Sequence, residues 1–386
     1  MEFQPKTIAG REIMSTVLVT GGCGFVGSWT VDLLIEKGYT VKIFDSLESQ
    51  VHRKGIPEYV NKKAELSKGD IRDKKMLGAL VSQADAIVHL AAEVGVGQSM
   101  YQIERYVDSN TRGTATLLDM LVDMKHKIKK LVVASSMSIY GEGKYYCKTC
   151  RSNNYPDTRE QEQLNNRVWE PLCPVCRNHL EPVATDEMKP LLPTSIYAMT
   201  KRHQEEMSIL IGKTYGIPTV ALRYFNIYGP RQSLSNPYTG VCAIFLSRIL
   251  NGEPPYIFED GRQSRDFVHV RDIAKANVLA LESDSATFNA INIGSGQSVS
   301  IGRLANVLLN ILDVKLEPLV SGEYRKGDIR HCYADIAKAK QLLKYTPSTD
   351  LTKGLEELAD WAQKNRKESL DLFEAALNEL KTRKLA

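Results

Sequence analysis

The sequence predicts an α/β fold, a doubly wound parallel sheet, for two reasons. Short apolar runs alternate along the chain with helical patterns, and the first run leads directly into a glycine-rich turn. Such alternation is typical of a parallel sheet with helices on both faces. With 386 residues, of which 43% are hydrophobic and 25% charged, the chain is long enough for one large α/β unit and a second, smaller lobe.

The strands and helices follow from these runs and patterns. The run at 16–20 is rich in β-branched residues, as expected of a buried parallel strand. Further strands are expected at 40–44, 65–68, 86–90, 131–134 and 219–222. Helices are expected at 28–37, 108–124 and 198–215, and later in the chain at 302–312, 355–364 and 367–384. The last of these is polar, so we expect it to be peripheral.

The glycine-rich turn predicts a dinucleotide site. Gly21, Gly24 and Gly27 lie between a strand and a helix, where they allow a tight turn, a close approach of a pyrophosphate and close helix–strand packing. Asp45 ends the next strand, 18 residues after Gly27, where a carboxylate binds ribose hydroxyls and repels a 2′-phosphate. This favours NAD over NADP in a Rossmann-type site. Asp70, after the third strand, is a candidate either for the adenine end or for a helix N-cap.

Four cysteines predict a metal site. Cys147 and Cys150 form one CxxC pair, and Cys173 and Cys176 form a second, with 22 residues between the two pairs. Two such turns present four thiolates to one ion, which is typical of structural zinc. A redox dithiol or a chance pairing is the alternative. We expect residues 144–182 to be a zinc-ribbon-like insert folded around its own metal.

Composition argues against several other classes of protein. The net charge is only +4 and is scattered, which does not suit nucleic-acid binding. No apolar stretch approaches the 18 residues of a membrane span, so no membrane association is expected. The first 15 residues carry charges and a proline instead of an apolar signal-peptide core. We therefore expect a cytoplasmic protein.

A possible catalytic group lies at the start of the helix expected at 198–215. Tyr197 and Lys201 are four residues apart, so they lie on one face of a helix, and the lysine cation would favour a tyrosinate that acts as a general acid/base. A surface pair is the alternative. Ser136 follows an apolar strand, and open α/β sheets bind ligands at the carboxyl ends of their strands.

Together these motifs resemble the extended short-chain dehydrogenases/reductases, in the branch of nucleotide-sugar epimerases and dehydratases. The similarity covers residues 15–350. Its motifs are GGCGFVG at 21–27, HLAA at 89–92, NTRGT at 110–114, YxxxK at 197–201, RYFNIYGPR at 223–231, RDFVHV at 265–270 and RKGD at 325–328.

The resemblance implies a role for each matching residue. Tyr197 is the acid/base, Lys201 also holds the nicotinamide ribose, and Ser136 binds the sugar hydroxyl that is oxidised. The implied cofactor site comprises Gly21, Gly24, Phe25, Val26, Gly27, Asp45, Asp70, Ile71, Leu90, Ala91, Ala92, Asn110, Tyr197 and Lys201. The implied substrate site comprises Ser136, Asn226, Arg265, Arg325 and Asp328, with Asn226 on the diphosphate and the arginines neutralising its charge. The alternatives are that Asn110 caps a helix and that the arginines are ordinary surface residues. We expect His89 to be structural.

The resemblance also implies the division of the chain. We expect an NAD-binding domain at 15–222, with 258–282 packing back on it, and the insert at 144–182 within it. A smaller α/β lobe at 223–257 and 283–365 would bind the nucleotide-diphosphate sugar, and 366–386 would form a helical tail. Relatives dimerise through two long helices per subunit, so we expect a homodimer through 108–124 and 198–215.

The residues after Ser136 predict the reaction. Dehydratases of this family resemble the pattern Thr-Asp-Glu at this point, and 3,5-epimerases have a cysteine at the second following position, but here Met137 and Ser138 occupy these positions. Neither side chain shuttles a proton at neutral pH. Oxidation at C4 to a keto sugar and return of the hydride to its other face require only Ser136, Tyr197 and a tightly held NAD. We therefore expect a 4-epimerase.

Segments 93–101 and 137–143, with the insert, resemble most the 4-epimerases that convert dTDP-L-rhamnose to dTDP-6-deoxy-L-talose. A UDP-hexose or UDP-uronate 4-epimerase is the alternative. A 4-keto-sugar reductase would more often use NADPH, which Asp45 disfavours, and a non-catalytic NAD-binding regulator would normally lack Tyr197 or Lys201.

Overall fold

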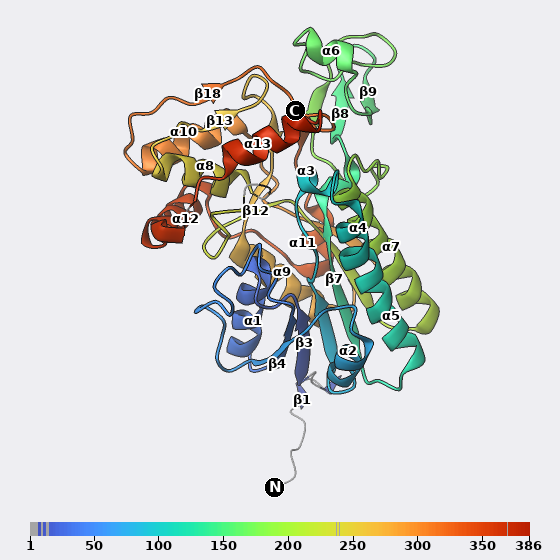
Figure 1. The fold of residues 1–386 in the computed structure, drawn as a ribbon. Helices are drawn as coiled ribbons and strands as arrows, with labels where there is room; N and C mark the ends of the chain where they lie inside the picture. Colours follow the sequence, from blue (N-terminus) through green and yellow to red (C-terminus); the bar gives the residue numbers. More distant parts are fainter. Residues whose placement is uncertain (1–6, 9–10, 13–14, 237, 239, 369) are drawn as a thin grey trace.

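The computed structural model describes residues 7–8, 11–12, 15–236, 238, 240–368 and 370–386, which form two lobes and a protruding insert (Figure 1). The larger lobe is built on a seven-stranded parallel sheet of order β16-β11-β7-β6-β3-β4-β5. The strands are β3 (Thr16–Thr20), β4 (Thr40–Asp45), β5 (Glu65–Lys68), β6 (Ala86–His89), β7 (Lys130–Ser136), β11 (Thr219–Tyr224) and β16 (Ala290–Ile293).

Helices cover both faces of this sheet. Val17 and Val19 of β3 belong to an apolar core with α1 (Phe25–Glu36) and α9 (Val270–Glu282). Leu18 points to the other face, into a core with α2 (Lys74–Val81) and α5 (Gly113–Asp123). Because side chains alternate along a strand, one apolar run supplies both cores. The predicted doubly wound parallel sheet is confirmed.

Two expected helices differ from the structure. The helix expected at 28–37 begins at Phe25, directly after Gly24, so its amino end lies at the glycine turn. The helix expected at 108–124 is α5 preceded by the π-helix η1 (Val107–Arg112), and α4 (Ile103–Tyr106) precedes η1. Sequence periodicity does not reveal such a π turn, which frequently marks a functional site.

The long helix α7 (Ile196–Tyr215) begins and ends at residues suited to both positions. The Ser195 side chain accepts a hydrogen bond from the Ala198 amide, 3.1 Å, and so caps its first turn. Gly216 ends it in the left-handed conformation, φ +70°. These two caps define where α7 begins and where it ends.

The smaller lobe packs three helices over short strands. Its helices are α8 (Val241–Leu250), α10 (Ile301–Ile311) and α12 (Leu351–Lys364), which share one apolar core. Its strands are β12 (Asn226–Tyr228), β13 (Tyr256–Ile257), β14 (Ser264–Arg265), β15 (Phe267–His269), β17 (Val299–Ser300), β18 (Leu319–Val320) and β19 (His331–Cys332). The expected range 283–365 is corrected at two points. β16 pairs with β11 as the edge strand of the large sheet, and α11 (Ala337–Leu343) packs into the core of that sheet.

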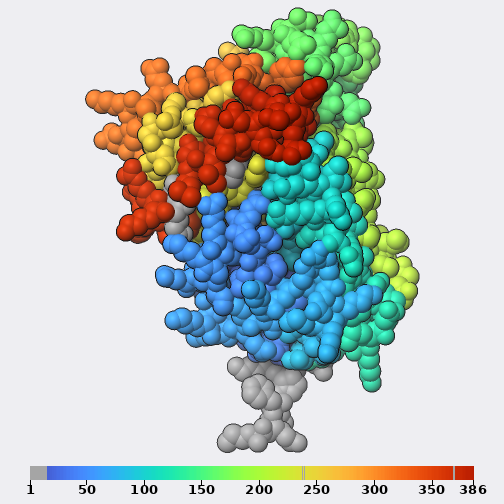
Figure 2. Space-filling model, in the orientation of Figure 1, coloured from blue at the N-terminus to red at the C-terminus, as the bar shows by residue number. Residues whose placement is uncertain are grey.

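The C-terminal helix α13 (Phe373–Thr382) corrects another expectation. The chain from 367 on is not a peripheral helix, because Phe373, Ala376, Leu377 and Leu380 are buried. The helix lies between the smaller lobe and the cyan segment around residue 100 (Figure 2). Its polar composition concealed the apolar stripe that makes this contact.

The insert forms a small domain at one end of the molecule (Figure 1). It contains the antiparallel sheet β10-β8-β9 and the helix α6. These are β8 (Lys144–Cys147), β9 (Ser152–Asn154), α6 (Gln161–Asn165) and β10 (Glu181–Val183). Its own apolar core has only four buried members, which are Tyr145, Cys147, Cys173 and Leu180.

The remaining elements are short. They are β1 (Thr7–Ile8), β2 (Arg11–Glu12), α3 (Val96–Ser99), η2 (Met137–Tyr140), α11 (Ala337–Leu343) and η3 (Arg366–Glu368). Among the described residues, no helix is both long enough and apolar enough to cross a membrane.

Candidate active site

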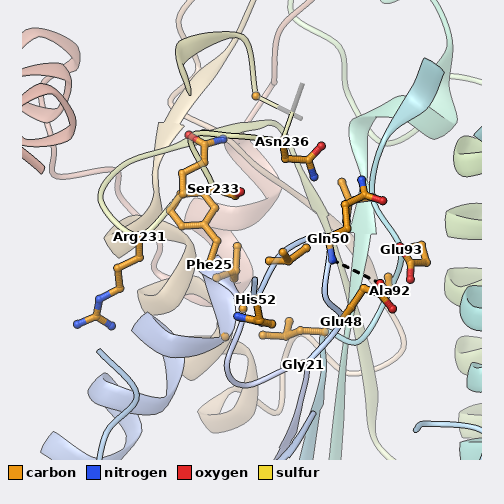
Figure 3. A pocket seen from close by; sticks show the side chains of 18 of the residues that line it. Gly21, Phe25, Glu48, Gln50, His52, Ala92, Glu93, Arg231, Ser233 and Asn236 are labelled. Carbon is orange, nitrogen blue, oxygen red and sulfur yellow. Dashed lines mark hydrogen bonds between the residues drawn. The ribbon is translucent and has the colours of Figure 1, made fainter. Parts of the chain in front are cut away.

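A cavity of about 920 Å³ lies at the carboxyl ends of the central strands and extends to the smaller lobe (Figure 3). Most of the sequence-predicted site residues line it. These are Gly21, Gly24, Phe25, Val26, Gly27, Asp45, Asp70, Ile71, Leu90, Ala91, Ala92, Ser136, Tyr197, Lys201 and Asn226. Asn110, Arg265, Arg325 and Asp328 are not among the lining residues.

The glycine turn forms a cradle that side chains would fill. Gly21 has φ +71°, and a Cβ on it would lie 2.9 Å from the Ala91 nitrogen. A Cβ on Gly27 would collide with the Gly21 carbonyl oxygen. The cradle opens toward the first turn of α1, whose N-cap, Gly24, offers no side-chain acceptor. Amides left free at a helix N-terminus bind phosphate, so this cradle fits the pyrophosphate of a dinucleotide.

Asp45 lies beside the cradle, at the end of β4. Its carboxylate accepts hydrogen bonds from the Cys23 amide, 2.9 Å, and from the Leu47 amide, 2.8 Å. A carboxylate oxygen has more than one lone pair, so these bonds leave acceptor capacity on the cavity side. The carboxylate is therefore placed to accept hydrogen bonds from the hydroxyls of a ribose.

Asp70 lies further along the same wall of the cavity. Hydrogen bonds from the Arg72 guanidinium hold its pKa below the usual range, despite partial burial. The alternative that Asp70 caps a helix does not hold, because the side chain of Asp73 accepts the amides of Lys75 and Met76 at the start of α2. Asp70 is thus an ionised side chain on the cavity wall.

Three predicted catalytic residues meet at one place in the cavity. Ser136 is the last residue of β7, and Tyr197 and Lys201 lie on successive turns of α7. The Ser136 side chain lies close enough to Tyr197 to lower the pKa of its phenol. The Ser136 hydroxyl accepts hydrogen bonds from the Ser138 hydroxyl, 2.9 Å, and from the Ser138 amide, 3.2 Å. The Tyr197 amide donates to the Ser99 hydroxyl, 3.0 Å, which ties the start of α7 to the segment after β6.

Burial shifts the pKa values of both α7 residues. It raises the pKa of Tyr197 to about 12, against the lowering effect of the Ser136 hydrogen bond. It lowers the pKa of Lys201 to about 7, against the raising effect of Glu205. Burial disfavours the charged form of each group, so the enclosed site favours a neutral phenol at Tyr197. This phenol lines the cavity, where it can both donate and accept a hydrogen bond.

A chain of buried hydrogen bonds supports Lys201 from behind. Its ammonium donates to the Gln204 side chain, 2.8 Å, and Gln204 donates to the Thr114 hydroxyl, 2.7 Å. His89 bridges Thr114, 3.0 Å, and Thr20, 2.7 Å. Burial, together with the Lys201 charge, lowers the pKa of His89 to about 3, so the imidazole is neutral. His89 thus has a structural place in this chain, as expected.

Two side chains on the opposite wall have buried polar atoms without a partner. The Oδ1 of Asn226 and the Oε1 of Gln232 make no hydrogen bond with the residues that the structure describes, although both residues line the cavity. An unpartnered buried polar group costs about 1–3 kcal/mol. A polar ligand in the cavity would satisfy both atoms.

The predicted residues outside the lining have other contacts. The Arg265 guanidinium donates to the carbonyls of Ser264, 2.8 Å, Ile329, 2.7 Å, and Arg330, 2.9 Å. Arg325 pairs with Asp328, 2.7 Å. In this geometry the two guanidinium groups brace the smaller lobe instead of facing the cavity.

Asn110 also makes its side-chain hydrogen bonds within the protein and not toward the cavity. It lies inside η1 instead of capping a helix, and its side chain bonds both backbone groups of Glu93, 2.7 and 3.0 Å, and the Thr200 hydroxyl, 3.0 Å. It thereby fixes the segment after β6, which lines the cavity, against the catalytic helix.

The four paired cysteines come together in the insert. The sulfurs of Cys147, Cys150, Cys173 and Cys176 all lie within 4.8 Å of one another. Backbone amides of Cys176 and Val175 lower the pKa of Cys173 to about 6, although burial opposes this. Four thiols this close, on two CxxC turns, are the donor set of a tetrahedral thiolate metal site.

The cavity has further walls that the sequence analysis did not identify. Residues 48 and 50–59, between β4 and β5, line it, and Trp361 and Asn365 line it from α12 and its C-cap. A signal for the first was present, because a loop of some 20 residues without periodicity inside a compact domain is often functional. No local signal marks Trp361, since only the packing of the two lobes brings it to the cavity.

Comparison with known proteins agrees with this site. The family model described as the NAD dependent epimerase/dehydratase family matches residues 17–161 and 177–294. The dTDP-L-rhamnose 4-epimerase of Burkholderia thailandensis is 34% identical over 348 residues, which cover 89% of this chain and 94% of that protein.

Two solved structures extend this comparison. The Thermotoga maritima UDP-glucose 4-epimerase with UDP-glucose has a TM-score of 0.75 and 31% identity, over 91% of this chain and 99% of that one. The UDP-glucuronic acid 4-epimerase of Bacillus cereus, in complex with UDP-glucuronic acid and NAD, has a TM-score of 0.74 and 28% identity, with the same coverage. The chain therefore belongs to the NAD-dependent epimerase/dehydratase family.

Proposed function

We propose that this protein is an NAD-dependent nucleotide-sugar 4-epimerase that interconverts dTDP-L-rhamnose and dTDP-6-deoxy-L-talose. The observation that carries the reaction is that Ser136, Tyr197 and Lys201 meet in the cavity that the glycine cradle opens into. Met137 and Ser138, at the positions where dehydratases of the family have carboxylates, also line the cavity. Loss of water from the sugar has no acid/base group there.

The residues of the chain divide the work as follows. The glycine cradle and Asp45 would hold NAD, which would supply a reversible hydride acceptor for C4 of the sugar. Ser136 holds the O4 hydroxyl, and Tyr197 removes its proton and later gives that proton back. Lys201, charged, stabilises the ionised Tyr197. The sugar loses a proton and a hydride and regains both, so the reaction consumes no cofactor.

Charge along the cavity supports a sugar without a carboxylate. Apart from Lys201, the basic residues among the described lining are His52, Arg53, Lys54, Arg231 and Lys367. The first three follow Asp45, and the Arg231 guanidinium pairs with Asp32 of α1, 2.7 Å, on the cradle side. The segments beside Ser136 contribute Met137, Val94 and Val96, which suit the methyl group of a 6-deoxy sugar.

A UDP-hexose 4-epimerase is the second candidate. It is supported by the likeness to the Thermotoga maritima enzyme, and it would use the same catalytic residues. The assignment of dTDP-L-rhamnose is supported by the Burkholderia thailandensis relative and by the apolar residues next to Ser136.

Three further properties belong to this proposal. The four cysteine sulfurs bind one structural zinc ion, and the protein acts in the cytoplasm, where thiols stay reduced. Two copies form a homodimer through the helices around α5 and α7, where Met199 and Leu210 are exposed apolar residues. Asn226 binds the substrate diphosphate, and its unpartnered amide oxygen marks this wall as polar.

A panel of dTDP-, UDP- and GDP-sugars, incubated without added NAD and analysed by NMR, tests the proposal. We expect dTDP-L-rhamnose to equilibrate with its C4 epimer. Epimerisation of a UDP-hexose alone would retain the mechanism and change the substrate. Net consumption of NADH or NADPH, with no change of sugar configuration, would contradict the epimerase itself.

A further inference from the structure

We propose that Arg105, Gln50 and Gln98 form a latch that retains the dinucleotide in its site. The latch joins two segments on opposite sides of the glycine cradle. One is the cover loop, residues 46–60 between β4 and β5, and the other is the segment 93–106 after β6. The proposal rests on NAD being the cofactor, and it assigns positioning residues that act on cofactor retention rather than on the sugar.

The order of the strands places the latch over the cradle. β3 lies between β6 and β4 in the sheet, and the glycine turn follows β3. The cover loop leaves the carboxyl end of β4, and the segment 93–106 follows β6. A connection between these two segments therefore crosses the end of β3, and a dinucleotide bound on the cradle lies beneath it.

The contacts across this gap are reciprocal. The amide of Gln50 donates to Gln98, 3.0 Å, and the amide of Gln98 donates back to Gln50, 3.1 Å. The Arg105 guanidinium donates to Gln50, 3.0 Å, and to the Glu93 carboxylate, 2.8 Å. One planar side chain thus binds both sides at once, as a guanidinium with fixed, forked donors is suited to do.

The side of the latch on segment 93–106 is rigid. Gln98 is only 4% exposed, and its carbonyl oxygen also accepts the Tyr106 hydroxyl, 3.2 Å. The same segment holds the start of α7 through Ser99 and is fixed by Asn110 at Glu93. It therefore offers a preorganised surface to which the cover loop attaches.

The cover loop depends on attachments at its two ends. It contains no helix or strand. Near its far end the Tyr59 hydroxyl donates to the Cys23 carbonyl, 3.3 Å, and Asn61 donates to Asp32, 2.8 Å. Near its start the loop is held by the hydrogen bonds of Gln50 to Gln98 and Arg105. Gln50 lies at the cavity, beside Glu48 and Glu93 (Figure 3). The latch thus holds the start of a loop whose middle residues line the cavity.

The chemistry gives a reason for such a latch. A 4-epimerase must keep the same dinucleotide between the removal of hydride and its return. A loop closed by hydrogen bonds around one guanidinium slows dissociation without any new contact to the cofactor. Hydrogen bonds to a charged group are among the stronger ones in proteins, so their loss is expected to appear mainly as faster release.

The test is the release of radiolabelled NAD from the loaded protein after dilution into excess unlabelled NAD. We expect Arg105→Leu and Gln50→Ala to speed release about 10- to 100-fold. Arg105→Lys has a single ammonium in place of the forked guanidinium, so we expect its rate of NAD release to lie between the rates of these variants and of the wild type. Arg303→Ala, at an exposed arginine of α10 in the smaller lobe, is the matched control.

Two results distinguish the latch from the proposed cofactor. Release from both latch variants at the wild-type rate overturns the latch and leaves NAD as the cofactor. A wild-type protein that retains no NAD overturns both. Gln50→Ala lies in a loop, so it keeps the test valid where Arg105→Leu fails to fold.

Discussion

The catalytic end of the large sheet and the four-cysteine insert are held together in different ways. At the sheet, Lys201, Gln204, Thr114 and His89 are buried and form hydrogen bonds with one another. Lys201 is the one member of this network with a basic amine. The insert has four buried apolar members in its core. It depends on thiols and on ion pairs instead.

The ion pairs of the insert reach into the smaller lobe. Arg330 is fully buried and binds Glu170 of the insert, 2.6 Å, together with Glu259 and Asp260, both 2.7 Å. Arg159 of the insert binds Glu259 as well, 2.8 Å. A large apolar core can thus enclose a buried lysine and a buried tyrosine, whereas a segment of some 40 residues has few apolar side chains and is tied to its neighbours by buried ion pairs.

The largest expected effect is a loss of turnover caused by a substitution at the carboxyl end of the large sheet. Tyr197→Phe removes the group that moves the proton, and we expect turnover to fall about 10³- to 10⁴-fold. NAD content and the unfolding transition should stay close to the wild type, because the ring remains packed. Tyr215→Phe, at the exposed end of the same helix, is the control and should keep full activity. A Tyr197→Phe enzyme with more than about a tenth of wild-type turnover would assign the proton transfer to another group.

The next effect concerns the insert alone. Cys173→Ser removes one of four ligands, so we expect loss of zinc and at least about tenfold faster proteolysis within 144–182. The measurements are metal analysis of the purified protein and limited trypsin digestion. Cys242→Ser, a buried cysteine of α8 far from the cluster, should retain the metal. Equal metal content in both variants would contradict the zinc site.

The smallest effect is a pH dependence that separates the two regions. Burial raises the pKa of Glu170, but hydrogen bonds from His331 and Arg330 outweigh it and lower the pKa to about 2, from a usual value of 4.5. The stability that ionised Glu170 contributes is therefore fully present above pH 4.5 and is lost as the pH falls toward 2. We expect wild type to exceed Glu170→Gln in free energy of unfolding at pH 6, with the difference vanishing near pH 2.

At Lys201 stability also rises with pH, but here the charged form destabilises the folded protein, whereas ionised Glu170 stabilises it. Its folded pKa is lowered to about 7, so the unfolded chain binds the extra proton between pH 7 and 10.5. The penalty for burying the charge is complete below pH 7 and disappears as the pH rises through this window. Chemical denaturation of Lys201→Met beside wild type should therefore show the variant gaining relative stability toward low pH. Parallel curves for the two proteins would contradict the shifted pKa.

Features that are set by residues close together in the sequence could be predicted from the sequence. The parallel sheet followed from alternating patterns, and the cradle followed from Gly21, Gly24 and Gly27, because a tight turn between strand and helix has a local signature. The CxxC pairs were equally local, and the structure brings their sulfurs together. The bounds of α1 and the π turn at 107–112 were missed, since both depend on what the backbone packs against.

Contacts between distant segments were decided by the tertiary structure alone. The cover loop reaches Arg105, α13 buries an apolar stripe in a polar segment, and Arg265 turns to backbone carbonyls 64 and 65 residues away. A side chain's residue type states which bonds it can make, but its partner depends on which groups the fold brings within about 3 Å. For this reason Ser136, Tyr197 and Lys201 could be proposed from the sequence, whereas the walls of the cavity that they line became visible only in the folded chain.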